Sequence, residues 1–307
     1  MANRTMNQSL LPTMMFAALV ASDAGAIEYK GLCEASAGAF IDRTHFAVAS
    51  DETNKLQIYE RGKPEPIGDG IDMKAFTSFD KSDLEAAATI GDRVYWISSH
   101  SFNSQGEDKS KRKVFFATTI VQTDGKPTLK DAGKPVKSLR DPLAKAAGVK
   151  PEEMNIEAMA ATPEGGLLIG LRAPLRNGEA LVVPFKNPKA VVDDPSTPPD
   201  FGEAVPVKLI DRGFRTMETL GGGTAQYAIV AGPVSDSAKG FALFRWSGPG
   251  TDPVEVKGVD LTGIKPEAAM SVPGQNLLQL LSDDGDICSD EDGNASKRRF
   301  RSIDVTP

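Results

Sequence analysis

Short apolar runs separated by polar turns make up most of the chain from residue 27 onward. Such runs are typical of β-strands, and no long stretch has the 3.6-residue period of an amphipathic helix. The pattern predicts an all-β protein. Short helical turns are expected only over Asp141–Met154 and Asp80–Ala88.

A small motif recurs along the chain: an apolar residue or Pro, then Glu, then Ala and further small or apolar residues. Four copies are Cys33–Ala37, Leu84–Ala88, Ile156–Ala160 and Pro266–Met270, and a degenerate copy, Phe214–Met217, has Arg215 in the Glu position. Two strand-like runs follow each copy, and a fourth, shorter run precedes the next one. The second-strand runs are Thr44–Ala49, Val94–Ser98, Gly166–Leu171, Gln226–Ala231 and Asn276–Leu281; the third-strand runs are Leu56–Tyr59, Val114–Thr118, Ala180–Phe185, Phe241–Trp246 and Phe300–Val305.

Four-stranded units at a regular period are the pattern of a β-propeller, and five copies predict five blades. The last copy has only three strands before Pro307, so we expect Ile27–Leu32 to supply the fourth and to close the ring. Closure of this kind removes exposed sheet edges. The alternatives are a six-bladed ring with one unrecognised blade and a β-sandwich with accidental repeats.

The N-terminus has the features of a secretory signal peptide. Arg4 precedes the apolar run Leu10–Ala21, and the small residues Ala24-Gly25-Ala26 follow as a cleavage pattern. We therefore expect a signal peptide at residues 1–26, a single propeller domain at 27–307, and a periplasmic or secreted protein. The run is too short for a membrane span; the alternative is an N-terminal helix packed on the domain.

Net charge and cysteine content narrow the classes of ligand and cofactor that the protein is expected to bind. The 307 residues include 35 Lys+Arg and 42 Asp+Glu, giving a net charge of −7, which argues against a generic nucleic-acid binder. Two cysteines exclude a zinc ribbon and an iron–sulfur cluster. We expect a monomer that binds a small anionic ligand or a glycan, with no nucleic acid and no membrane span in the mature chain.

Propeller geometry predicts that the unusual polar residues gather on one face. The inner strands start on the face where the turns between second and third strands also lie. The repeat residues Glu34, Glu85, Glu157, Arg215 and Glu267 should ring the axis there, and the turns should add Asp51, His100, Arg172, Arg176 and Asp283.

Four carboxylates at one axis cannot all stay ionised without compensation. A hard cation such as Ca²⁺, held by Glu34, Glu85, Glu157 and Glu267, would compensate them, and Ca²⁺ is the cofactor we consider. Pairing with Arg215 and Arg172 is a second solution. Hydrogen bonds from Glu to the backbone of the neighbouring blade, a purely structural role, are a third.

Candidate chemistry follows from the same face. His100, with Glu85 and Glu157, is a candidate acid or base, although a loop histidine without a chemical role fits equally well. Arg172, Arg176, Arg215, Asp51 and Asp283 are candidate ligand-binding residues, the arginines for a phosphate or carboxylate. Their alternative is a salt-bridge role with the acidic turns.

The two cysteines fall near the ring junction. Cys33 precedes Glu34, and Cys288 lies in the second-to-third turn of the last blade, so a Cys33–Cys288 disulfide would fasten the closure. Two separate buried thiols are the alternative. The nearby acidic stretch from Asp283 onward fails the spacing of an EF-hand, and we interpret it as a solvated loop.

Several runs together resemble one uncharacterised bacterial family, filed as domain of unknown function thirty-six sixteen. They include Tyr95–Ser101, Gly170–Arg176 and Leu281–Gly285, and the likeness spans about residues 28–305. This resemblance implies no established activity. More distantly, the first blade resembles calcium-activated apyrases, five-bladed enzymes that hydrolyse nucleotides around a central calcium held through Glu and Ser; Glu34 and Ser36 match, and Arg215 departs from an all-acidic ring.

Two functions therefore stay open: a hydrolase acting on a phosphate ester or another anionic substrate, and a non-catalytic module that binds a glycan, peptide or protein. A deep pocket with a strongly perturbed carboxylate or histidine would favour the first, and a shallow hydrated face the second.

Overall fold

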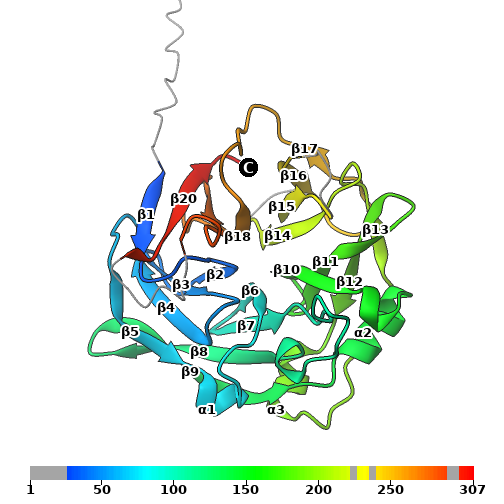
Figure 1. The fold of residues 1–307 in the computed structure, drawn as a ribbon, viewed down its shortest axis with the longest axis horizontal. Coiled ribbons are helices and arrows are strands. Elements are labelled where there is room, and N and C mark those ends of the chain that lie inside the picture. Colours follow the sequence, from blue (N-terminus) through cyan, green and yellow to red (C-terminus); the bar gives the residue numbers. More distant parts are fainter. Residues whose placement is uncertain (1–25, 222–226, 235–239, 289–296) are drawn as a thin grey trace, which may run out of the picture.

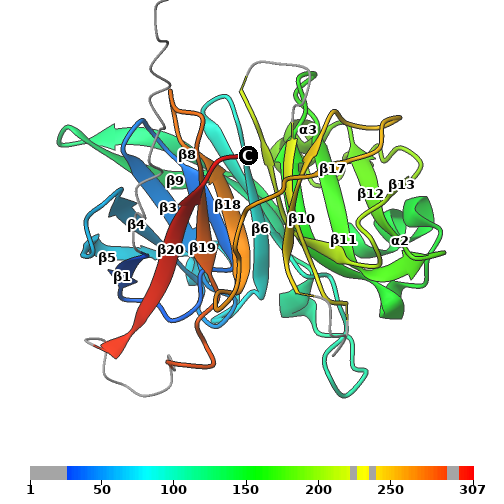
Figure 2. The same ribbon diagram turned by 90° about the horizontal axis from the view of Figure 1, so that it is seen from above.

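Five four-stranded antiparallel sheets stand around a central axis in the computed structural model, which describes residues 26–221, 227–234, 240–288 and 297–307 (Figure 1). Seen from the side, the sheets form a short cylinder with the inner strands at its middle (Figure 2). The predicted five-bladed β-propeller is confirmed, and the sandwich and the six-bladed ring do not describe this arrangement. The expected signal peptide lies almost entirely outside the described residues and stays a prediction.

Four blades follow the chain from the axis outward. The first contains β2 (Ala37–Phe40), β3 (His45–Ala49), β4 (Lys55–Glu60) and β5 (Pro66–Asp72). The second contains β6 (Leu84–Ile90), β7 (Arg93–Ser98), β8 (Phe115–Thr123) and β9 (Lys126–Val136). The third contains β10 (Asn155–Ala161), β11 (Leu167–Arg176), β12 (Glu179–Phe185) and β13 (Val205–Val207). The fourth contains β14 (Gly213–Thr219), β15 (Tyr227–Gly232), β16 (Ala242–Trp246) and β17 (Val254–Glu255).

The fifth blade joins the two ends of the chain. It contains β18 (Pro266–Ser271), β19 (Leu278–Ser282), β20 (Arg299–Val305) and, as its outer strand, β1 (Ile27–Lys30). β1 pairs antiparallel with β20, with Ile27 opposite Ser302 and Lys30 opposite Arg299. The predicted closure by an N-terminal strand is therefore confirmed.

The hydrophobic core lies between the blades. The described residues form five apolar clusters, each shared by two neighbouring blades. At the closure, the rings of Tyr29, Phe46, Tyr59 and Phe300 pack together. The ring centroids of Tyr29 and Tyr59 are 5.3 Å apart, and each of them lies 5.2–5.6 Å from the centroids of Phe46 and Phe300. These aromatic contacts tie β1 and β20 to the first blade and add to the main-chain pairing.

Small residues recur near the axis because strands of neighbouring blades approach one another closely there. A Cβ added to Gly38 would lie 3.0 Å from the sulfur of Met270 in the neighbouring blade. A Cβ on Gly170, in the third blade, would lie 2.7 Å from the ring of Phe214. Alanine and glycine near the axis therefore allow five sheets to fit around one centre.

Short helices occupy the longer connections. They are α1 (Lys74–Thr77), η1 (Ser110–Arg112), α2 (Arg140–Ala147), η2 (Pro151–Glu153) and α3 (Pro188–Asp193). The helical turn expected over Asp141–Met154 is confirmed by α2, which ends where Gly148 adopts a left-handed φ of 63°. The one expected over Asp80–Ala88 is wrong, because Leu84–Ile90 is extended and pairs with β7 along the axis. Among the described residues, no helix is long and apolar enough to cross a membrane.

Candidate functional site

The repeated Glu or Arg occupies an irregular position in its strand. In four blades the pairing of the inner strand with the second strand shifts by one residue, and the residue skipped is Glu85, Glu157, Arg215 or Glu267. A bulge of this kind leaves one residue outside the ladder and redirects its side chain. The motif therefore places a polar side chain at the same end of four inner strands, and Glu34 lies just before the fifth, β2.

On one side of the axis the carboxylates are paired with arginine. Nη1 of Arg215 lies 2.9 Å from Oε2 of Glu157, and Nη2 of Arg215 contacts Glu267. Arg172 contacts the other oxygen of Glu157 through Nη1 at 2.8 Å. The side chains of Arg215 and Glu157 are only 8% and 6% exposed, so these charges compensate each other out of bulk water. We call Glu157, Arg172, Arg215 and Glu267 the arginine-paired side.

On the other side, five carboxylates gather with much less compensation. Oxygen atoms of Glu34, Asp51 and Glu52 lie within 4.8 Å of one another, and so do those of Asp51, Asp83 and Glu85. Asp51 belongs to both groups and joins them. We call these five residues the acidic cluster.

The cations around the acidic cluster reach only its edges. Lys81 pairs with Glu52, and Nη2 of Arg112 lies 2.8 Å from Asp83, which also accepts a hydrogen bond from the hydroxyl of Ser99. The carboxylate of Glu85 makes no hydrogen bond or ion pair with any described residue. Oε2 of Glu34 is buried and likewise has no hydrogen-bond partner in the described part of the chain.

Two members of the acidic cluster, Glu34 and Glu85, therefore favour the protonated state. Burial, a hydrogen bond with Asp51, and the charges of Asp51 and Asp283 raise the pKa of Glu34 to about 10. Burial, followed by the charges of Asp83 and Glu157, raises the pKa of Glu85 well above its usual range. Such carboxylates hold protons at neutral pH unless another cation takes the place of those protons.

The donor set of the acidic cluster fits a hard divalent cation. Carboxylate oxygens are the ligands that Ca²⁺ prefers, and several of those here lack a cationic partner. Glu34 and Glu85 from the expected set of ligands belong to the cluster. Glu157 and Glu267 do not, because Arg215 already pairs with both. The expected set of four glutamates is thus divided between the two sides of the axis.

Asp283 lies close to the cluster. Burial raises its pKa against the opposing effect of the hydrogen bond it accepts from the Gly285 amide, at 2.9 Å, and its charge acts on Glu34. A Cβ on Gly285 would overlap Oε1 of Glu34, so this glycine makes room for the carboxylate. Both expected turn residues, Asp51 and Asp283, are therefore next to Glu34.

His100 is not an accessible acid or base. Its side chain is completely buried, its Nδ1 lies 2.9 Å from the Ser98 carbonyl, and burial lowers its pKa to about 4. A neutral histidine in this position is part of the packing, so we correct the expectation of a catalytic His100 on the open face.

The two arginines of the third blade separate. Arg172 joins the axis, where its Nε also donates to the carbonyl of Pro233 at 3.1 Å. Arg176 is exposed at the end of β11, and its Nη2 donates to the carbonyl of Ala147 at the end of α2. The expected pair of anion-binding arginines is therefore reduced to Arg172.

The expected disulfide is present, and it lies next to the site. Cys33 and Cys288 are bonded, with 5.6 Å between their Cα atoms and a sequence separation of 255. Next to it, Arg301 binds the buried carboxylate of Asp284 with Nε and Nη2 at 2.9 and 2.7 Å. The bond fixes Cys33 directly before Glu34.

Asp83 and Arg112 are among the residues of this site that were not expected from the sequence. Asp83 precedes β6 in a left-handed conformation, with φ of 51°, and Arg112 comes from η1 in the long loop between β7 and β8. Asp83 lies two residues before Glu85, so an acidic residue flanking the motif is a signal that could have found it. Nothing in the spacing indicates Arg112.

No protein-family model and no curated protein matches this sequence. Among solved structures, a glucose dehydrogenase is 13% identical with a TM-score of 0.44, over 92% of this chain and 99% of that one. The propeller domain of Myceliophteria thermophila Cps50 is 10% identical, with a TM-score of 0.40 over 92% and 99%. A Trypanosoma rangeli sialidase is 13% identical, with a TM-score of 0.42 over 84% of this chain and 47% of that one. At these values the likenesses support no functional argument.

Proposed function

We propose that this protein is an exported propeller that binds a divalent cation, Ca²⁺ first of all, in the acidic cluster, and an anionic ligand beside it. The observation that carries the proposal is the gathering of Glu34, Asp51, Glu52, Asp83 and Glu85 with cations only at its edges. A bound cation would neutralise the charge that otherwise has to be neutralised by protons.

The anionic ligand follows from the neighbouring arginine-paired side. The side chain of Arg172 is 29% exposed, so it can reach a group placed at the mouth of the axis. Guanidinium groups bind phosphate and carboxylate in a planar, bidentate way. A phosphate ester fits this combination of a hard cation and an arginine, and in a hydrolase the cation would supply polarisation of the phosphoryl oxygen.

A non-catalytic binding role is the second candidate, and one observation favours it. His100 is buried and neutral, and Arg215 is occupied by two carboxylates, so neither of these two residues supplies an accessible base. The ligand would then be a glycan, a peptide or a protein with an anionic group held through the cation.

Export and the resemblance to the uncharacterised family named above belong to the same proposal. A disulfide between Cys33 and Cys288 is compatible with an oxidising compartment, which supports a periplasmic or secreted location.

The test begins with the thermal midpoint of the purified protein in EDTA and after Ca²⁺ is restored. Saturation at about 100 times Kd adds roughly 2.7 kcal/mol, a rise of several degrees. Glu85→Gln should reduce the rise, whereas the exposed control Glu152→Gln should leave it unchanged. Absence of any rise in the parent protein contradicts the cation site.

Hydrolysis is tested separately with p-nitrophenyl phosphate and nucleoside triphosphates, in Ca²⁺ and in EDTA. Turnover that needs Ca²⁺ and falls in Arg172→Gln supports the hydrolase. A calcium-dependent midpoint without turnover supports the binding module instead.

A further inference from the structure

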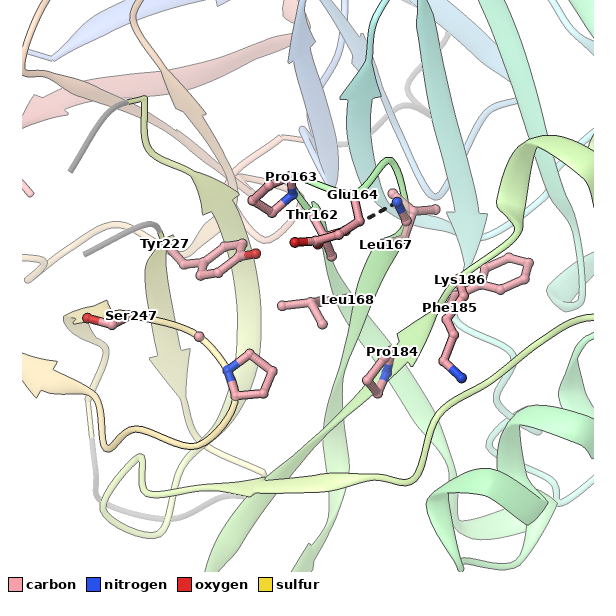
Figure 3. A pocket seen from close by; sticks show the side chains of 13 residues that line it. Thr162, Pro163, Glu164, Leu167, Leu168, Pro184, Phe185, Lys186, Tyr227 and Ser247 are labelled. Atoms are coloured by element: carbon pink, nitrogen blue, oxygen red, sulfur yellow. Dashed lines mark hydrogen bonds between the residues drawn. The ribbon is translucent and has the colours of Figure 1, made fainter. Parts of the chain in front are cut away.

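A cavity lies in the third and fourth blades, at the end of the propeller opposite to the acidic cluster. Its volume is about 450 Å³, and its walls come from the β10–β11 turn, the end of β12, the start of β15 and the segment after β16. Since β10 runs from the site end to this turn, the cavity is a full strand length away from the acidic cluster. It is shown from close by in Figure 3.

Tyr227 presents a polar atom to this cavity from an otherwise buried side chain. The residue is 2% exposed, and its hydroxyl makes no hydrogen bond with any described residue. In Figure 3 the hydroxyl points toward the wall that contains Thr162, Pro163 and Glu164. The ring of Tyr227 packs against the ring of Trp246, with 5.6 Å between their centroids. Gly248 also lies close to it, since a Cβ added to Gly248 would be 3.3 Å from Cε2 of Tyr227. These contacts hold the tyrosine ring in place.

Glu164 supplies a charge without a partner. It forms no ion pair with the described residues. Burial raises the pKa of Tyr227, and the charge of Glu164 raises it further. The turn that carries Glu164 is well defined, because Thr162 and Gly166 exchange hydrogen bonds at 2.9 and 3.2 Å. The carboxylate is thus presented at the rim on a fixed support.

The remaining walls are mostly apolar. Leu168, Pro184, Phe185 and Pro249 line the cavity, and Lys186 lies at its edge. Nζ of Lys186 lies 3.3 Å from Asp200, so its charge already has a partner. The uncompensated charge at this cavity is therefore negative.

We propose that this cavity binds a small organic cation, a primary ammonium group on an apolar body. The ammonium donates hydrogen bonds to Oη of Tyr227 and to the carboxylate of Glu164, and the apolar body packs against Leu168 and the prolines. Pockets of this size that combine apolar walls with a few convergent polar groups are typical of small-molecule sites. The site is independent of the cation proposed at the acidic cluster.

The probe is 2-phenylethylammonium, titrated into the full protein by calorimetry and followed by NMR of the ligand. The matched neutral and anionic probes are 2-phenylethanol and 3-phenylpropanoate. We expect the ammonium to bind about tenfold more tightly than the alcohol, and the carboxylate to bind more weakly than either.

Variants separate the two contacts. Glu164→Gln should weaken binding of the ammonium by about tenfold and leave the alcohol unchanged. Tyr227→Phe should weaken it by a few-fold without changing the thermal midpoint, because the hydroxyl has no partner to lose. Lys186→Gln, on the edge of the same cavity, is the control and should not weaken the ammonium.

Four results would overturn the proposal, and the first three concern the ammonium probe. They are no binding of the ammonium at 10 mM (about the weakest affinity of interest), equal binding of the alcohol and the ammonium, and ammonium binding that survives both Glu164→Gln and Tyr227→Phe. Tighter binding of the carboxylate probe would also overturn it, because Lys186 would then determine the ligand.

Discussion

Of the charged groups at the axis, Arg215 is the one whose removal should lower the stability of the protein most. It pairs with both Glu157 and Glu267, and the three side chains are 8%, 6% and 14% exposed. In Arg215→Met the volume is nearly kept, and two carboxylates lose their common cation at once. Breaking a buried ion pair from one side typically costs about 3–5 kcal/mol, since the remaining charge is uncompensated.

The assay is thermal unfolding of the parent and the variant in EDTA at pH 7. For a chain of this length, each kcal/mol shifts Tm by ~2 °C, so a loss of about 6–10 °C is expected. Arg245→Met is the matched control, because Arg245 is an exposed arginine in the same blade, and its effect should stay within about 0.5 kcal/mol.

A rescue experiment tests the cause. Adding Glu267→Gln to Arg215→Met removes the carboxylate that is left without a cation, since Glu157 keeps its pair with Arg172, and should restore most of the loss. A loss below about 1 kcal/mol in Arg215→Met, the size of an exposed ion pair, would refute the reasoning. So would a double variant, Arg215→Met with Glu267→Gln, that is less stable than the single one.

Two further predictions concern the closure and the acidic cluster. Replacing Cys33 and Cys288 by Ala should lower the free energy of unfolding by about 2–5 kcal/mol, measured by urea unfolding; no change in the midpoint would contradict a structural role for the bond. In EDTA, stability should fall as pH rises from 5 to 8, because the raised pKa values of Glu34 and Glu85 mean that the folded state holds protons that the unfolded state, with carboxyls near 4.5, releases. Each group contributes at most ~1.4 kcal/mol per pH unit, less for the partly exposed Glu34, and a midpoint that is flat or rises over this range would contradict the assignment.

The sequence was sufficient for the architecture because each blade repeats the same local solution. Small residues are required where strands of neighbouring blades approach near the axis, as Gly38 of β2 and Gly170 of β11 show, and the Glu or Arg marks the bulge at the start of the inner strand. The closing strand followed from the missing fourth strand of the last blade, and the disulfide followed from the closure.

The division of the axis into two sides could not be predicted in the same way. Equivalent positions in a ring are equally near the axis. The repeat motif alone therefore does not say with which carboxylates Arg215 forms ion pairs. Arg112 reaches the cluster from a long loop, and the burial of His100 depends on the packing of that loop. Both are outcomes of tertiary structure without a local signal.

The most direct test of the acidic cluster as a cation site is calorimetric titration of Ca²⁺ into EDTA-treated, desalted protein. Asp51 belongs to both groups of carboxylates, so Asp51→Asn should weaken binding more than any other single change, and Glu152→Gln should leave it as in the parent. Binding in the parent that is lost in Asp51→Asn is the predicted result. Absence of Ca²⁺ binding in the parent, or equal binding in Asp51→Asn, would contradict it and make the cluster a set of structural carboxyl groups.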